Sequence, residues 1–148
     1  MELIIKSFGE LSAAELYEIL RVRAAVFVVE QSCPYQDPDG ADAEALHVCL
    51  REGAEVRAYL RVLRRGGEVC IGRVLTTERG RGLGARVLDA GIAAARDRFG
   101  ARRIMIEAQT YAAGFYERAG FVRCSEEFLE DGIPHIKMTL ALASGEEK

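Results

Sequence analysis

The residues best suited to chemistry in this chain form a glycine- and arginine-rich turn, RGRGLG, at residues 79–84. Residues 69–76 before it have the apolar, β-branched character of a strand, and residues 85–96 after it carry apolar side chains at helical spacing. A glycine-rich turn that opens a helix offers unpaired backbone N–H groups and the positive end of the helix dipole. This pattern predicts an anion site, most often one for phosphate.

The side chains of the turn favour the same kind of ligand. Gly82 and Gly84 allow the backbone to approach an anion closely, and Arg79, Arg81 and Arg86 supply charge suited to phosphate oxygens. The alternative is a plain strand–helix connection with surface arginines. The convergence of three alternate glycines and three arginines on one helix start favours phosphate binding.

Two common phosphate-binding motifs can be compared with this turn. A Walker loop ends in Gly-Lys-Ser/Thr, whereas this turn ends in Gly84-Ala85-Arg86, which argues against an NTPase. The spacing Gly80-x-Gly82-x-x-Ala85 does satisfy the dinucleotide fingerprint of NAD(P)-dependent oxidoreductases. That fingerprint follows the first strand of repeated βαβ units, however, and this turn lies in mid-chain behind several expected strands without helices between them.

Charge is distributed unevenly along the chain. The net charge is −3, but residues 79–103 hold seven arginines and two aspartates, so this segment is +5 and the remainder is −8. Residues 30–47 contain no Lys or Arg and five acids, which are Glu30, Asp37, Asp39, Asp42 and Glu44. We expect this segment to face a cationic partner, with Glu30, Asp37 and Asp39 as its contacts. Solvated surface charge is the alternative, and the overall acidity argues against nucleic acid.

Length and composition indicate one globular domain over residues 1–143, with a frayed tail at 144–148. Neither a run of 18 apolar residues nor a signal-peptide pattern occurs, so we expect a cytoplasmic protein without a membrane partner. The four cysteines are scattered, with no C-x-x-C and no metal-ligand spacing, so we expect no metal. Cys49, Cys70 and Cys124 lie in apolar, strand-like surroundings and are expected to be buried thiols.

Periodicity and turn residues predict the element order. A capping box at Ser12 and Glu15 opens the first helix, which should run to about Glu30 and be followed by an irregular loop at 32–45. The expected strands are 3–6, 46–51, 56–63, 69–76, 103–108, 122–124 and 136–142, and the later helices are 85–96 and 112–119.

This order resembles the GCN5-related N-acetyltransferase (GNAT) fold, and two motifs carry the resemblance. Arg79-x-x-Gly82-x-Gly84 is similar to the family's loop for the pyrophosphate of coenzyme A. Ala112-x-x-Phe115-Tyr116-x-x-x-Gly120-Phe121 resembles the family's later motif. The resemblance covers nearly the whole chain. It implies an α/β (α+β) fold with a mixed, mostly antiparallel twisted sheet flanked by helices, and with a central strand–phosphate loop–helix unit.

A narrower resemblance is to the ElaA group within that superfamily. The segments that carry it are VFVVEQ at 26–31, CPYQD at 33–37, Asp39-Gly40 and EDGIPH at 130–135. Gln109 stands where the wider family often has Asn.

The resemblance implies an acyl-CoA-dependent N-acyltransferase, with acetyl-CoA as co-substrate and a small-molecule or peptide amine as acceptor, attacked directly in a ternary complex. Tyr116 would protonate the leaving thiolate, and His135 and Glu107 are candidates for the general base, with Glu30 and His47 also near the acidic segment. A homodimer is possible. The expected cofactor contacts are Val74, Leu75, Arg79, Gly80, Arg81, Gly82, Leu83, Gly84, Ala85 and Arg86.

Two other functions compete with this one. A catalytically weak domain that binds or senses acyl-CoA would keep the same loop, and an NAD(P)-dependent oxidoreductase would use its dinucleotide-like spacing. Intact loop glycines and Tyr116 favour the enzyme.

Overall fold

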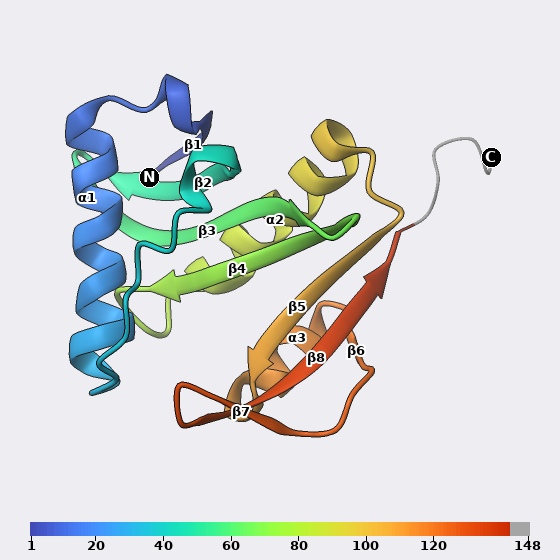
Figure 1. The fold of residues 1–148 in the computed structure, drawn as a ribbon. Coiled ribbons are helices and arrows are strands. Elements are labelled where there is room, and N and C mark those ends of the chain that lie inside the picture. The colour runs from blue at the N-terminus through green and yellow to red at the C-terminus, as the bar shows by residue number, and fades with distance from the viewer. Residues whose placement is uncertain (143–148) are drawn as a thin grey trace.

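The computed structural model describes residues 1–142, which form one sheet with helices on both faces (Figure 1). The expected tail at 144–148, and the domain end at 143, lie outside the described residues. The strands are β1 (Glu2–Ser7), β2 (Leu46–Glu52), β3 (Glu55–Arg65), β4 (Glu68–Thr76), β5 (Arg103–Gln109), β6 (Val122–Arg123), β7 (Phe128–Glu130) and β8 (Ile133–Ala141). The helices are α1 (Ala13–Arg23), α2 (Leu83–Phe99) and α3 (Ala113–Arg118), with wider π-helical turns in η2 (Ala24–Glu30) directly after α1.

The sheet has the order β1-β2-β3-β4-β5-β8-β6, with β7 paired to β8. All pairs are antiparallel except β4 with β5. The expected mixed, mostly antiparallel sheet is therefore confirmed. A doubly wound dinucleotide fold would instead have a mostly parallel sheet, so the dinucleotide-like spacing of the loop stands in the wrong architecture for an NAD(P) enzyme.

Strand β7 was not predicted from the sequence. β7 pairs with β8 through a hairpin whose turn is Asp131-Gly132, with φ of 53° and 76°. Two consecutive residues with positive φ are what a tight hairpin turn requires, and Asp-Gly is a strong sequence signal for it. The three strand residues were too few to show a period of two.

Each face of the sheet is covered by different helices. Ala58, Leu60 and Val62 of β3 belong to the large core beneath α2 and α3, whereas Tyr59 belongs to a second core with Ile19 of α1. The central strand is therefore buried on both faces. α1 covers only the β1–β4 side of the sheet (Figure 1), which leaves this face of β5 and β8 uncovered by a helix.

β4 and β5 separate along their length (Figure 1). They pair only at Val69 with Ile104 and at Cys70 with Met105, near the start of each strand. The remainder of β4 has β3 as its only neighbouring strand among residues 1–142. The backbone groups on the β5 side of β4 are thus free of sheet bonds, and this splay opens the central cleft of the molecule.

The four cysteine side chains differ in exposure. Cys33 and Cys49 are buried, Cys70 is half-buried and Cys124 is exposed, so the expectation of a buried Cys124 was wrong. Cys124 begins the connection between β6 and β7, at the sheet edge. Within residues 1–142, no cluster of three or more His, Cys, Asp or Glu side chains could hold a metal ion. No helix in that part of the chain is long and apolar enough to cross a membrane.

Gly91 of α2 allows the helix to pack closely on β3. A Cβ at this position would lie 2.8 Å from both δ carbons of Leu60, which is fully buried.

We expect Gly91→Val to lower the free energy of unfolding by about 1–3 kcal/mol, because the core must shift to accept the added carbons. Urea denaturation would measure this. Asp89→Val places the same side chain on the exposed face of α2 and should change stability by less than about 0.5 kcal/mol. Equal effects of both substitutions would contradict close packing at Gly91.

Candidate functional site

The predicted phosphate loop has the geometry of an anion site. Gly80 and Gly82 have φ of 80° and 70°, and an added Cβ at either would meet no atom within 4 Å. Gly82 is the N-cap residue of α2, and no side chain caps the helix. The first bond of the helix is made by the Arg86 N–H to the Gly82 oxygen at 3.2 Å. The N–H groups of residues 83–85 precede it and point toward the loop, where they can bind an anion.

The arginines around this loop differ in their partners. The side chains of Arg79 and Arg86 are exposed and make no hydrogen bond or ion pair within residues 1–142. Arg81 is instead bound to Glu78 at 2.9 Å, so its charge is largely compensated. Arg118 of α3 lines the same cleft as Arg79. The sequence analysis missed Arg118, although it lies within the second motif.

Gly84 has a different role from the other loop glycines. A Cβ there would lie 3.3 Å from the Phe115 ring and 3.6 Å from the Thr76 side chain. Its missing side chain therefore lets the start of α2 pack against α3 and β4. The two motifs that resembled the GNAT family thus touch each other in the structure.

A single cleft of about 1060 Å³ runs from this loop, between β4 and β5, to the β7–β8 hairpin. It collects most of the predicted site residues. Those lining it are Glu30, Val74, Leu75, Arg79, Gly80, Gly82, Leu83, Gly84, Ala85, Glu107, Tyr116 and His135. Of the other predicted residues, Asp37, Asp39, His47, Arg81 and Arg86 are not part of the lining formed by residues 1–142.

A bulge in β4 determines which backbone groups face the cleft. Arg61 of β3 pairs with Gly72, and Tyr59 pairs with Leu75, so β4 has one extra residue between these pairs. After the bulge, the Thr77 N–H donates to the Arg57 oxygen of β3 at 2.9 Å. Because successive N–H groups of a strand point to opposite edges, those of Thr76 and Val74 are directed toward the cleft. The N–H of Leu75 faces β3.

Tyr116 lies on the cleft wall. Its side chain is 8% exposed and packs edge-on against Phe115 and Phe121, with ring centroids 5.0 and 5.9 Å away. The hydroxyl makes no hydrogen bond within residues 1–142. Burial raises the pKa of Tyr116, because the phenolate loses its hydration. The group therefore keeps its proton and can act as a donor.

His135 of β8 lies toward the hairpin end of the cleft and is 8% exposed. Its Nδ1 is 2.7 Å from the Ile133 oxygen, which can only accept, so Nδ1 carries the proton and donates. The neutral ring then has a lone pair on Nε2, which is available to accept a proton. Phe128 stacks on the ring at 6.0 Å and fixes its orientation.

Two carboxyl groups lie beside His135. Glu107 of β5 and Glu130 of β7 both line the cleft. The pKa of Glu130 is raised by burial first, and then by the negative charge and the hydrogen bond of Glu107. The two carboxyl groups are therefore close enough to influence each other. Glu130 was not among the predicted site residues, although it opens the EDGIPH segment that carried the ElaA resemblance.

Two contacts join the η2 end of the cleft to its β5–β8 wall. Gln109 donates to the Gln31 side-chain oxygen at 3.1 Å. The buried Cys33 thiol donates to the Asp131 oxygen at 3.5 Å. The loop after η2 is thus attached to the β7–β8 hairpin across the cleft, even though nearly 100 residues separate them in sequence.

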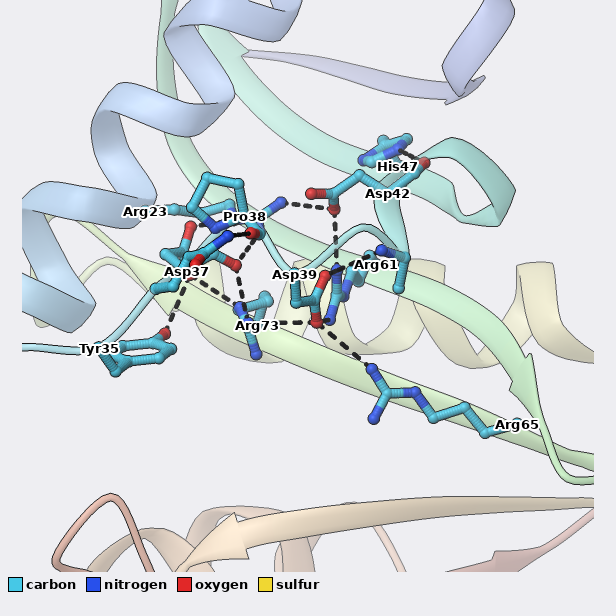
Figure 2. Close-up of polar contacts among 12 residues, drawn as sticks. Arg23, Tyr35, Asp37, Pro38, Asp39, Asp42, His47, Arg61, Arg65 and Arg73 are labelled. Atoms are coloured by element: carbon cyan, nitrogen blue, oxygen red, sulfur yellow. Dashed lines mark hydrogen bonds and ion pairs between the residues drawn. The ribbon is translucent and has the colours of Figure 1, made fainter.

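The acidic segment is not the uncompensated surface that the sequence suggested. Asp37, Asp39 and Asp42 bind arginines from α1, β3 and β4 (Figure 2). Arg23 and Arg61 are 0% and 2% exposed and need these carboxylates as partners. The expectation of free acceptor-binding charge on Asp37 and Asp39 was wrong, because the balancing arginines come from distant segments of the chain.

His47 is likewise part of this buried network. It is fully buried. Its Nδ1 accepts from the Tyr59 hydroxyl at 2.7 Å, and its Nε2 donates to the backbone oxygen of Asp42 at 3.0 Å. Both ring nitrogens are thus occupied, so His47 cannot serve as the general base.

The fold and the anion-binding loop define an acetyltransferase (GNAT) domain, and the chain belongs to this family, whose model matches residues 15–142. Within the family it is an ElaA-like protein. It is 38% identical to ElaA of Escherichia coli over 137 residues, which cover 88% of this chain and 90% of the relative. A UPF0039 protein of Mycobacterium bovis is 44% identical over 138 residues, covering 87% and 86%.

Solved structures agree with this assignment. The crystal structure of E. coli ElaA matches with a TM-score of 0.90 and 36% identity, covering 95% of this chain and 99% of that one. An acyl-CoA N-acyltransferase from Pseudomonas aeruginosa also matches with a TM-score of 0.90, at 38% identity, covering 95% and 100%. The resemblance predicted from the two motifs is confirmed.

The buried His47 makes stability depend on pH. Burial lowers the pKa of His47 below the value of about 6.5 that it has in the unfolded chain. Its contribution to stability is therefore complete above pH 6.5 and is lost as the pH falls through the folded-state pKa. We expect the free energy of unfolding to decrease over this range, by at most about 1.4 kcal/mol per pH unit.

His47→Gln provides the matched variant, because an amide can accept from Tyr59 and donate to Asp42 without titrating. Urea denaturation between pH 5 and 7 should show a shallower slope for His47→Gln than for the wild type. The same slope in both proteins would assign the pH dependence to other groups.

Proposed function

We propose that this protein transfers an acetyl group from acetyl-CoA to a primary amine by direct attack in a ternary complex. The observation that carries the proposal is that one continuous cleft contains an anion-binding loop, a free strand edge and a tyrosine hydroxyl that has no hydrogen-bond partner within residues 1–142. These are the three groups that acyl transfer from a thioester requires: one to hold the donor, one to polarise its carbonyl and one to protonate the thiolate.

The residues of the loop fit a coenzyme A pyrophosphate. Residues 83–85 offer N–H groups, Gly80 and Gly82 leave open space for the phosphates, and Arg79 and Arg118 line the cleft as cations. Arg86 is exposed beside them and can add charge. Arg81 is occupied by Glu78, so we assign it a smaller role in binding.

The strand edge would polarise the thioester. The N–H groups of Val74 and Thr76 face the cleft beyond the last β4–β5 pair. An N–H aimed at the carbonyl oxygen stabilises the negative charge that develops there as the amine attacks. Leu75 lines the cleft, but its N–H and carbonyl both face β3, because the two groups of one strand residue point to the same edge, so we assign it no polarising role.

Two proton transfers complete the reaction. The amine nitrogen must lose a proton, which we assign to the His135 Nε2 lone pair or to the Glu107–Glu130 pair, directly or through water. When the C–S bond breaks, the thiolate takes the proton of Tyr116, which burial keeps on the phenol. The phenolate left behind regains a proton from solvent.

The acceptor would enter at the end of the cleft opposite the phosphates. Glu30, Glu107, Glu130 and Asp131 line that end and give it negative charge. We therefore propose a small-molecule or peptide amine as the acceptor, recognised as a cation before it is deprotonated. A cytoplasmic location and a homodimer are further parts of this proposal.

The first test concerns the cofactor. Isothermal titration calorimetry should show that acetyl-CoA binds and that NADH does not. Gly82→Ala should weaken acetyl-CoA binding by about tenfold or more, because a side chain strains the left-handed φ of 70° and displaces the N–H groups of the loop.

Gly100→Ala is the matched control. Gly100 caps the other end of α2, has a φ of 63° and also has open space at its Cβ position. Both variants should lose similar stability, but acetyl-CoA affinity should fall only in Gly82→Ala. Equal affinity for NADH, or equal loss in both variants, would contradict the proposed donor site.

The second test concerns Tyr116. Tyr116→Phe keeps the ring packing and removes only the hydroxyl, so kcat should fall by about tenfold or more while the acetyl-CoA Kd changes little. Steady-state rates with a panel of amines, combined with single-turnover measurements, would show this. An unchanged kcat under conditions where chemistry limits the rate would limit Tyr116 to packing. Binding of acetyl-CoA without turnover of any amine by the wild type would favour an acyl-CoA sensor.

A further inference from the structure

Arg73 of β4 has an unusual backbone conformation. Its φ is 53°, and within residues 1–142 only Ser32 and Asp131 share a positive φ without being glycine. Both of those residues lie in turns, whereas Arg73 lies inside a strand. A residue with a side chain adopts this conformation at a cost, and it persists where the surroundings determine it. Arg73 is also the bulged residue directly before Val74, whose N–H faces the cleft.

The Arg73 side chain, which lines the cleft together with Tyr35, is held by several contacts. Its Nε donates to Asp37 Oδ1 at 2.8 Å, and one terminal nitrogen donates to the Asp37 backbone oxygen at 2.9 Å (Figure 2). The guanidinium also lies over the Tyr35 ring, 5.5 Å from its centroid. This two-point attachment to one residue restrains the direction of the side chain as well as its charge.

Asp37 is itself a rigid anchor. It is 3% exposed, its second carboxylate oxygen accepts from Arg23 at 2.8 Å, and the Tyr35 hydroxyl donates to its first oxygen at 2.9 Å. Arg23 belongs to α1 and is completely buried. The chain of contacts thus runs from the core under α1, through Asp37, to the bulge of β4.

We propose that Arg73 is a positioning residue for acyl transfer. Anchored on Asp37, it holds the left-handed bulge that directs the Val74 and Thr76 N–H groups at the thioester carbonyl. This inference rests on the proposed function. It also gives the acidic segment a role, because Asp37 supports the polarising strand and does not contact the amine.

Two substitutions separate the backbone role of Arg73 from its charge. Arg73→Ala and Arg73→Gly both remove every side-chain contact, but glycine adopts a φ of 53° without cost. We expect Arg73→Ala to lower kcat by about tenfold or more, because a misdirected N–H loses part of the stabilisation that such a donor provides. Arg73→Gly should be at least about threefold more active than Arg73→Ala, although it lacks the same contacts.

Binding and stability measurements accompany these rates. The coenzyme A Kd should change by less than about threefold in both variants, since the phosphate loop is intact. Arg51→Ala is the control, because Arg51 has similar exposure and two carboxylate partners but no positive φ. It should lose some thermal stability and keep the wild-type kcat.

A third variant tests the anchor. Asp37→Asn should lower kcat in the wild-type background and change it much less in the Arg73→Gly background, where the contact is already gone. An equal loss in both backgrounds would show that Asp37 acts independently of Arg73. If Asp37→Asn does not fold, the alanine and glycine variants of Arg73 decide the question alone.

The results that overturn the proposal are distinct. A wild-type kcat in Arg73→Ala, or a glycine variant no more active than the alanine variant, overturns the positioning role while the proposed function stands. A wild-type protein that transfers no acyl group overturns the proposed function and the inference together.

Discussion

Burial of the Arg23 and Arg61 guanidinium groups is the constraint on which the site depends. An unpaired charge in the interior costs several kcal/mol, so these arginines require carboxylates close by. Asp37, Asp39 and Asp42 supply them from the segment between η2 and β2, and their three negative charges balance those of Arg23, Arg61 and Arg73. Each of these aspartates contacts an arginine from another part of the chain, and these ion pairs restrain the path of the segment. Neutralisation of buried charge therefore shapes the wall of the cleft.

The cleft itself results from interrupted pairing. β4 and β5 are joined at only two residue pairs, and the bulge at Arg73 turns β4 further from the regular ladder. The free N–H groups that this leaves would be costly in a closed core, but they face a cleft where a ligand or water can bind them. Gly84 then lets α2 pack against Phe115, which brings the anion-binding loop and Tyr116 to the same opening. The interrupted pairing of β4 with β5 and the absence of a side chain at Gly84 thus together form the site.

Local patterns in the sequence were sufficient for the fold and for the donor half of the site. The capping box at Ser12, the alternation in β3 and the glycine-rich turn each act through neighbouring residues, so their consequences are visible in the chain. The acceptor half depends on contacts between segments far apart. Nothing in residues 30–47 indicates that Asp37 contacts Arg73, which lies 36 residues away. In the same way, the sequence around Glu130 does not indicate that it lies beside Glu107. Counting charges within residues 30–47 alone therefore gave a wrong prediction of which carboxylates have no cationic partner.

The distribution of protons along the cleft also gives the proposed reaction a direction. On the cleft wall, burial in an aromatic cluster keeps Tyr116 protonated, which suits a group that must donate. Toward the hairpin, the Ile133 oxygen holds the His135 proton on Nδ1 and leaves Nε2 able to accept, and the neighbouring Glu107 helps to raise the pKa of Glu130. Acyl transfer moves one proton from the amine and delivers another to sulfur. In the proposed reaction, the accepting groups would lie beside the entering amine and Tyr116 beside the departing thiolate, so the site would be ready for both transfers before the substrates bind.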